Sequence, residues 1–380
     1  MAKKPAKKSK TASPEKGNYV SEWLGQRIYP VVRLDVGKFP KSGYDTCPFL
    51  STVLRSPAKC VKNENSLGVC TINASSNGPR QDWLACPYRV IDSGIVTDAC
   101  EKIFSDKPPA RPTPASLLSD AWARQAFQKS VRNAGRGYLF FQDKLGGEIS
   151  ILGSDRSPEM AFDITIVEIL HTSGRYALGR YGILEVQTMD FHGSYKKAVA
   201  NLRDAFRLHK KKFSEALRKD QAWAAEDIEG PNIANVFKRT FYQMMLKFEL
   251  GGKAAAAGTV LAIPQAVWDS WQPFLGKPSL ERLSDGTYEL KSSMQRGTPQ
   301  PNAHICVFDL DASSAKPISP VSVQKFIRVS PDQLAHHAFK VVPANMLSAL
   351  QGQDSILAGI KARLIRWWPE LEVGSNSNAS

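Results

Sequence analysis

The stretch MAFDITIVEILHTSGRYALGRYGILEVQT, residues 160–188, decides the fold class. Its first eight residues alternate between apolar and polar side chains, so Asp163 lies on the face of a predicted strand opposite the apolar side chains. A glycine-containing loop leads to another predicted strand, 181–188, where the two-residue period places Glu185 and Gln187 side by side. Two strands joined by a loop are typical of antiparallel neighbours, so the stretch predicts part of a sheet.

Periodic segments on both sides of this stretch predict further elements. A strand is expected at 147–152, and apolar residues spaced three or four apart indicate helices elsewhere. The predicted helices cover 115–131, 195–217, 232–248 and 354–368, and the later strands cover 259–263, 305–310 and 326–329. The chain is therefore predicted to be α/β, with a mixed α+β sheet flanked by helices.

Length and composition predict a soluble globular chain with a basic surface. The 380 residues are 42% hydrophobic and 23% charged, which is enough to bury a sizeable core. No run approaches the ~18 apolar residues of a membrane span, and the Lys-rich start lacks the apolar segment of a secretory signal, so we expect a cytoplasmic protein. The net charge of +14 indicates a polyanionic partner, either nucleic acid or an acidic membrane face.

Changes in composition divide the chain into four parts. Residues 1–16 are Lys-rich and are predicted to form a disordered basic tail, which either tethers DNA or only improves solubility. Residues 17–105 are rich in Pro, Gly, Asn and Ser and are expected to be irregular. The segment DKPPARPTP (106–114) marks a boundary, after which the larger domain covers 106–370 and a second disordered tail covers 371–380.

Four of the six cysteines fall within one 40-residue window of the N-terminal part, with the spacing C-x12-C-x9-C-x15-C. In a reducing compartment, grouped thiols bind a metal more often than they form disulfides. Four thiolates leave no open position on the metal, so such a site would brace an irregular segment, and thiolate chemistry alone favours zinc. The four are Cys47, Cys60, Cys70 and Cys86.

Carboxylates on neighbouring predicted strands form a candidate catalytic site. Asp163 and the pair Glu185-x-Gln187, with Glu148 on the preceding strand as a third carboxylate, have the arrangement that holds a divalent metal against a phosphodiester. Mg²⁺ is a hard ion that takes oxygen ligands, and three acids on adjacent strands would repel one another without a cation between them. The spacing alone leaves open an ordinary placement of carboxylates at strand ends.

Longer strings in the chain resemble the NotI restriction endonuclease family. They run in the same order from about residue 18 to residue 368, and lapse between about 92 and 132, after Lys196, and between 284 and 301. The strings are FFQDKLGGEIS (140–150), SPEMAFD (157–163), LEVQTMDFHGSYK (184–196), EGPNIANVFKRTFYQM (229–244), AIPQAVWDSW (262–271) and the cysteine contexts TCPFL, KCVK, GVC and WLACP.

The resemblance implies a PD-(D/E)XK restriction-endonuclease-like core plus a small four-cysteine metal-binding domain. By position, Glu148, Asp163, Glu185 and Gln187 fall on the family's catalytic pattern, with Mg²⁺ as the cofactor. Gln187 stands where most PD-(D/E)XK enzymes place Lys, and an amide can hold the attacking water but brings no positive charge.

The same resemblance implies iron in the four-cysteine site, with zinc as the alternative. The family's four ligands match Cys47, Cys60, Cys70 and Cys86, whereas Cys100 and Cys306 do not match and are interpreted as buried apolar residues.

The implied activity is that of a type II restriction endonuclease cutting double-stranded DNA at a GC-rich palindrome centred on GGCC, such as CGGCCG or GCGGCCGC. A palindrome has a two-fold axis, so we expect a homodimer. A cognate DNA methyltransferase is expected in the same restriction-modification system without a stable complex, and no membrane partner is expected.

Candidate base-reading residues follow from the chemistry of GC pairs. Arg and Lys suit guanine, whereas Asp and Glu accept from cytosine. Phosphate contact or a plain surface role stays open for each candidate. The predicted DNA-contacting residues are Asp190, His192, Lys196, Lys238 and Arg239, with Trp83 and Arg89, close to Cys86, at the outer base pairs.

The sequence leaves two other functions to consider. A sequence-specific DNA-binding regulator would use the four-cysteine module and carry an inactive nuclease core. An HNH-type nuclease built on His192 is disfavoured, because no second His or Asn follows it at the required spacing.

Overall fold

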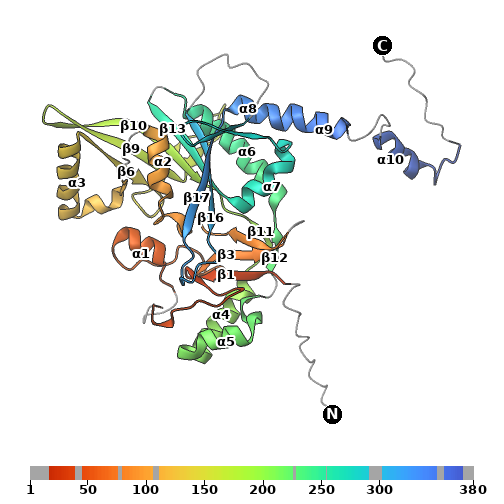
Figure 1. Cartoon of the computed structure of the whole chain (residues 1–380), viewed down its shortest axis with the longest axis horizontal. Coiled ribbons are helices and arrows are strands. Elements are labelled where there is room, and N and C mark those ends of the chain that lie inside the picture. The colour runs from red at the N-terminus through yellow and green to blue at the C-terminus, as the bar shows by residue number, and fades with distance from the viewer. Residues whose placement is uncertain are drawn as a thin grey trace.

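Within the described part of the chain, nine strands form a mixed sheet at the centre of the molecule (Figure 1). Neighbours β10, β13 and β16 are parallel, whereas β9–β10, β6–β9 and β16–β17 are antiparallel, which confirms the predicted mixed sheet. Across the sheet the order is β14 (Leu280–Arg282), β15 (Tyr288–Leu290), β17 (Val321–Arg328), β16 (Ala303–Leu310), β13 (Ala256–Pro264), β10 (Arg175–Val186), β9 (Ile164–Thr172), β6 (Arg136–Phe141) and β5 (Thr113–Pro114).

The computed structural model describes residues 17–38, 45–75, 79–105, 111–225, 228–253, 255–290, 302–348 and 355–370. The two tails predicted at 1–16 and 371–380 lie outside the described residues, as do residues 106–110 of the predicted boundary.

β9 and β10 form the antiparallel pair that the sequence predicts, with Leu184 opposite Ile164. The strand predicted at 160–167 is divided at Asp163 into β8 (Met160–Phe162), which pairs with β7 (Ile149–Ile151), and β9, which continues to Thr172. β10 begins at Arg175, so the predicted loop is a hairpin that turns at Ser173 and Gly174, both with positive φ. The end of the hairpin projects beyond the rest of the sheet (Figure 1), and residues 175–178 are exposed. No face of that part is buried, so its sequence carries no alternation by which the strand could be recognised.

Helices cover both faces of the sheet. On one face, α2 (Ile95–Phe104) packs against β10 and β13, where Val260 and Ala262 point into the same buried cluster. On the other face, α6 (Ile233–Leu250) and α7 (Gln265–Leu275) pack against the alternate residues Leu261 and Ile263. A strand buried on both faces reads as a continuous apolar run, as β13 does.

The N-terminal part contains an antiparallel sheet, which the sequence did not predict. Its order is β2 (Gln26–Arg27), β1 (Tyr19–Trp23), β3 (Val69–Ala74) and β4 (Gln81–Leu84), and α1 (Pro48–Leu54) lies between β2 and β3 in the chain. The expectation of an irregular segment at 17–105 is therefore wrong. The strands were missed because β1 and β2 are buried at every residue, polar ones included, and β1 is irregularly paired with β3.

The basic helix predicted at 195–217 is broken into two. α4 (Lys196–His209) and α5 (Phe213–Lys219) are separated by a 3-10 turn, Lys210–Lys212, that begins at Lys210 with a φ of 45°. The break brings the rings of Phe206 and Phe213 to 5.3 Å, and both rings contact Trp23 of the N-terminal sheet. The predicted helix at 232–248 is confirmed as α6.

Two buried clusters join the N-terminal part to the large sheet. One cluster combines Trp23 and Trp83 with the α6 and α7 side chains, and the other combines Phe49 and Cys70 with Ile103 of α2 and with β10. The predicted boundary at 105–106 therefore separates parts of the chain that share their cores.

The remaining described elements are short or peripheral. The segment predicted as one helix at 115–131 is a 3-10 turn, Ala115–Ser119, followed by α3. The remaining helices are α3 (Ala121–Ala134), α8 (Pro331–His336), α9 (Val342–Ser348) and α10 (Ser355–Leu364). Two further strand pairs are β7 (Ile149–Ile151) with β8 (Met160–Phe162), and β11 (Phe191–Gly193) with β12 (Ile228–Pro231). Among the described residues, no helix has the length and apolar character needed to cross a membrane.

Candidate active site

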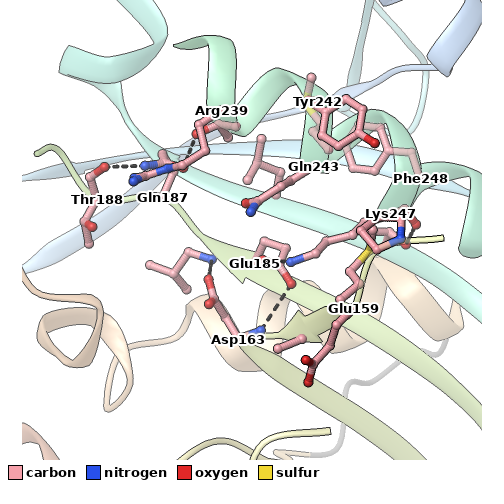
Figure 2. Close-up of a pocket in the computed structure, with 18 residues that line it drawn as sticks. Glu159, Asp163, Glu185, Gln187, Thr188, Arg239, Tyr242, Gln243, Lys247 and Phe248 are labelled. Atoms are coloured by element: carbon pink, nitrogen blue, oxygen red, sulfur yellow. Dashed lines mark hydrogen bonds and ion pairs between the residues drawn. The ribbon is translucent and has the colours of Figure 1, made fainter. Parts of the chain in front are cut away.

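A cavity of about 570 Å³ lies between the end of β10, the β8–β9 junction and helix α6 (Figure 2). Asp163, Glu185 and Gln187 line it from the sheet side, which brings three of the four predicted catalytic residues together. Thr240 and Lys247 line it from α6.

Asp163 and Glu185 hold one another in place through the backbone. The N–H of Asp163 donates to Oε1 of Glu185 at 3.2 Å, and the N–H of Val186 donates to Oδ2 of Asp163 at 3.0 Å. Because β9 and β10 are paired, the residue before one strand and the penultimate residue of the other meet at the same end of the sheet. The two carboxylates are therefore fixed at the cavity wall (Figure 2).

Burial and, to a smaller extent, the negative charge of Asp163 raise the pKa of Glu185 to about 8, against the opposing effect of Lys247. Two adjacent carboxylates that resist joint ionisation favour a cation between them. Mg²⁺ is commonly bound by one or two carboxylates and completes its shell with water, and an open cavity with two carboxylate side chains fits that requirement. Asp163 and Glu185 are the residues that would hold the ion.

Gln187 lies one residue beyond β10 and has protein partners at both ends of its amide. Its Oε1 accepts from the Thr240 hydroxyl, and its Nε2 donates to the carbonyl oxygen of Thr188. Gln187 is therefore tied to α6 and carries no charge.

Glu148 is the predicted catalytic residue that the structure does not bring into the cavity. Glu148 immediately precedes β7, and Asp163 immediately follows β8. Because Ile149 of β7 pairs with Phe162 of β8, the backbones of Glu148 and Asp163 lie at the same end of this strand pair. The Glu148 side chain is exposed and is absent from the cavity wall, whereas Glu159, which sequence reasoning missed, lines the cavity.

Lys247 is a second residue that sequence reasoning missed. Its Nζ lies 2.5 Å from Oε2 of Glu185, and its side chain is only 5% exposed. The signal was available, because Lys247 lies on the same stripe of the predicted helix as Met244 and Phe248, where apolar residues are expected.

The DNA-contacting residues predicted around the catalytic strand are exposed. Asp190 and Arg239 form an ion pair at 2.8 Å that links the segment after β10 to α6, and Arg239 also lines the cavity. The exposed members of the set are Asp190, His192, Lys196, Lys238 and Arg239.

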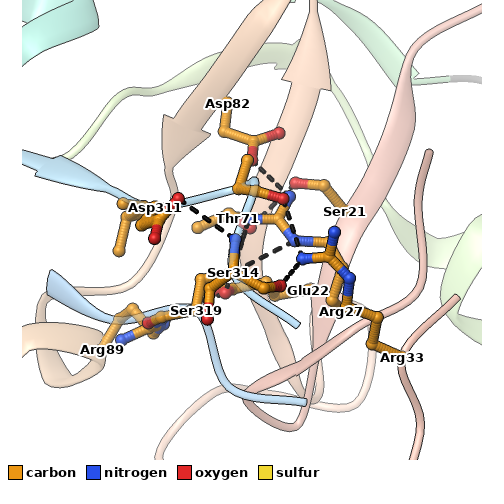
Figure 3. A network of polar contacts seen from close by, with 12 residues as sticks. Ser21, Glu22, Arg27, Arg33, Thr71, Asp82, Arg89, Asp311, Ser314 and Ser319 are labelled. Atoms are coloured by element: carbon orange, nitrogen blue, oxygen red, sulfur yellow. Dashed lines mark hydrogen bonds and ion pairs between the residues drawn. The ribbon is translucent and has the colours of Figure 1, made fainter. Parts of the chain in front are cut away.

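Trp83 and Arg89, also predicted to contact DNA, are each 1% exposed and have internal partners. Nε1 of Trp83 donates to the Ala74 carbonyl oxygen at 3.1 Å. Arg89 donates to both oxygens of Glu22 at 2.6 and 3.0 Å, in a buried network that also contains Arg27 (Figure 3). Neither side chain offers a polar atom to a base, because each is buried and already paired.

The four cysteines of the predicted metal site are near one another. Cys47, Cys70 and Cys86 belong to one buried cluster, and Cys60 packs against it. Burial raises the pKa of Cys47 to about 11 and raises those of Cys70 and Cys86, and neighbouring thiols add to each rise.

The sulfur of one of these cysteines also accepts a backbone hydrogen bond. Cys47 precedes a proline, and its Sγ accepts from the backbone N–H of Leu50 at 3.5 Å. Among the described residues, however, no group of three or more His, Cys, Asp or Glu side chains has the spacing that would hold an ion.

No protein-family model matches this chain, and no curated protein matches it significantly. Its function therefore has to be inferred from the residues of the cavity and from the sequence resemblance.

Proposed function

We propose that the chain is a type II restriction endonuclease with a PD-(D/E)XK-type core, which hydrolyses phosphodiester bonds in double-stranded DNA with Mg²⁺. The observation that carries the proposal is the meeting of Asp163 and Glu185, from adjacent strands, at one cavity wall beside Gln187. These residues come from the strings that resemble the NotI family.

The chain's own residues divide the work of hydrolysis. Asp163 and Glu185 would hold Mg²⁺, and Gln187, fixed by Thr240, would orient the attacking water through its free hydrogen-bonding capacity. When bound, the ion lowers the pKa of the water and offsets charge on the phosphate oxygens. Arg239 and Lys238, exposed on α6, would contact the DNA beside the cut phosphate.

Recognition of a GC-rich palindrome centred on GGCC is proposed from the sequence resemblance. The exposed residues Asp190, His192 and Lys196 lie just after the strand that carries Glu185, where they could reach the bases next to the scissile bond. A homodimer in which each subunit reads one half-site suits such a target. Trp83 and Arg89 are buried, so we do not propose that they contact the DNA.

A plasmid digest tests the proposal. The purified chain is incubated with Mg²⁺ and plasmids carrying GCGGCCGC, CGGCCG or only GGCC, and the ends are mapped by run-off sequencing. We expect discrete fragments from at least one of the plasmids and none in EDTA. A gel shift of the same DNA without fragments would contradict the proposal and favour the DNA-binding regulator.

We also propose that Cys47, Cys60, Cys70 and Cys86 hold one iron or zinc ion that braces the N-terminal part. The supporting observations are the shared buried cluster and the backbone N–H of Leu50 directed at the Cys47 sulfur. The metal would act on folding rather than on hydrolysis, since four thiolates leave no open position.

Substitution of Cys70 tests the cysteine site. We expect Cys70→Ser to lose the metal and to lower the unfolding temperature by more than 5 °C, because binding energy of a structural ion is folding energy. Elemental analysis and thermal unfolding are the measurements, with Cys100→Ser as the control for loss of a buried thiol. A metal content below about half an equivalent in folded wild-type protein would overturn the assignment.

A further inference from the structure

Lys247 is a buried cation in the wall of the candidate active site. An ammonium removed from water is costly unless it is paired, and only 5% of this side chain is exposed. Its Nζ contacts Oε2 of Glu185 at 2.5 Å and lies 5.7 Å from the centre of the Phe162 ring. The residue is therefore placed for an electrostatic interaction inside the cavity rather than for contact with solvent.

The contact completes the hydrogen bonding of the Glu185 carboxylate. Oε1 accepts from the backbone of Asp163, and Oε2 faces Lys247, so each oxygen has a donor from a different element (Figure 2). A carboxylate held at both oxygens has a defined orientation, and its negative charge is partly compensated although Asp163 lies beside it.

Helix α6 contacts both positions of the Glu185-x-Gln187 motif. Thr240 and Lys247 are seven residues apart and so lie on one face of the helix, two turns from each other. Thr240 binds Gln187, and Lys247 binds Glu185. Uncharged Gln187, just after the strand, and charged Lys247 of the helix therefore line the same cavity.

We propose that Lys247 is a positioning residue that supplies, from α6, the positive charge that Gln187 cannot supply from the strand. It orients Glu185 for the metal and keeps a fixed cation in the cavity where negative charge builds up during hydrolysis. This inference rests on the proposed nuclease function.

Three variants test the inference beside the wild-type chain. Lys247→Met removes the charge, Lys247→Arg retains it, and Lys253→Met is the matched control at an exposed lysine just after α6. Thermal unfolding checks the fold, calorimetry measures Mn²⁺ binding without DNA, and single-turnover cleavage is measured at saturating Mg²⁺. If Lys247→Met does not fold, Lys247→Gln, which keeps a donor without the charge, replaces it.

We expect opposite movements of metal affinity and rate in Lys247→Met. Mn²⁺ should bind at least threefold more tightly, because a divalent ion no longer shares Glu185 with the ammonium. The cleavage rate should fall at least a hundredfold, and Lys247→Arg should cut at least ten times faster than Lys247→Met. A merely structural role would weaken metal binding and slow cleavage together.

Two outcomes overturn the inference while the proposed function stands. One is cleavage by Lys247→Met within threefold of wild type. The other is a slow Lys247→Met variant that binds Mn²⁺ no more tightly than the wild-type chain. Failure of the wild-type chain to cut any GGCC-containing DNA instead overturns the proposed function, and this inference with it.

Discussion

Asp163 and Glu185 place two carboxylates within reach of each other's backbone in a cavity that α6 closes on one side. The same proximity that suits a cation raises the energy of the folded chain when no cation is bound. Activity and stability should therefore respond in opposite directions to removal of one charge.

Asp163→Asn tests that opposition. The amide oxygen can still accept from the Val186 N–H, so the backbone contact survives while the like charge beside Glu185 is lost. We expect cleavage to fall by more than about 10³-fold, because a well-bound ion contributes several kcal/mol in the transition state. The free energy of unfolding in EDTA should rise by about 1 kcal/mol, measured by urea titration. Asp155→Asn, at an exposed carboxylate, should change neither quantity.

His304 on β16 makes stability depend on mildly acidic pH. Burial and, to a smaller extent, the positive charges of Arg328 and Lys102 lower its pKa to about 4, against the opposing effect of Asp285. The unfolded chain takes up a proton near pH 6.5 that the folded chain resists, so this contribution to stability is complete above about pH 6.5 and is lost as pH falls towards 4.

The size of the His304 effect follows from the shift. Between pH 7 and pH 4 it should cost on the order of 3 kcal/mol of unfolding free energy. Urea titrations across this range should show a smaller loss for His304→Leu than for wild type, whatever the absolute stability of the variant. An equal loss in both proteins would show that other groups set the acid limb. The same substitution at exposed His209 is the control.

At the scale of elements, the sequence predicted the helices and strands that bury one face or form long apolar runs. β9, β10 and α6 were recognised because their apolar spacing is regular, and the acids on two of them could be placed at one end of the sheet. The N-terminal sheet was missed because its polar residues are buried along with its apolar ones. Lys247 was missed because apolar spacing identifies a buried face of a helix but does not show that a charged residue on that face is buried with a partner.

The buried network around Glu22 shows what those hidden polar residues do. Arg89 bonds to both Glu22 oxygens and donates to the carbonyl oxygen of Ser319 at 2.5 Å, and Arg27 lies 3.7 Å from Glu22 (Figure 3). The pairing connects the N-terminal sheet to the segment between β16 and β17.

Arg89→Met tests this structural role. We expect a loss of about 3–5 kcal/mol in unfolding free energy, because Glu22 would stay buried with one poorly placed partner. Denaturant titration is the measurement, and the DNA affinity of the folded fraction should be unchanged. Reduced affinity without reduced stability would instead support the sequence-based prediction that Arg89 contacts DNA.

At the scale of the whole molecule, the net charge of +14 predicts strong, salt-sensitive binding to DNA. Lys210, Lys211 and Lys212 are exposed on the turn between α4 and α5, while the apolar side of those helices packs on the N-terminal sheet. The lysines are therefore presented outward on an anchored element.

Replacement of the three lysines by glutamine should lower the slope of log affinity against log salt by about one to three, since each phosphate contact contributes about 0.9. Fluorescence anisotropy between 50 and 300 mM salt, roughly the range over which such contacts are resolved, measures the slope. The triple arginine variant retains the charge and should keep the wild-type slope. An unchanged slope for the glutamine variant would identify the lysines as an ordinary solvated surface.

The buried clusters that unite both sides of residue 105 bear on protein engineering. Removing residues 1–105 to isolate a portable nuclease module would uncover the face of β10 and β13 beneath α2, next to the strand end that carries Glu185. The proposed cleavage site and the N-terminal sheet are therefore not separable modules. A fusion protein with altered specificity would have to keep the whole chain and change surface side chains instead.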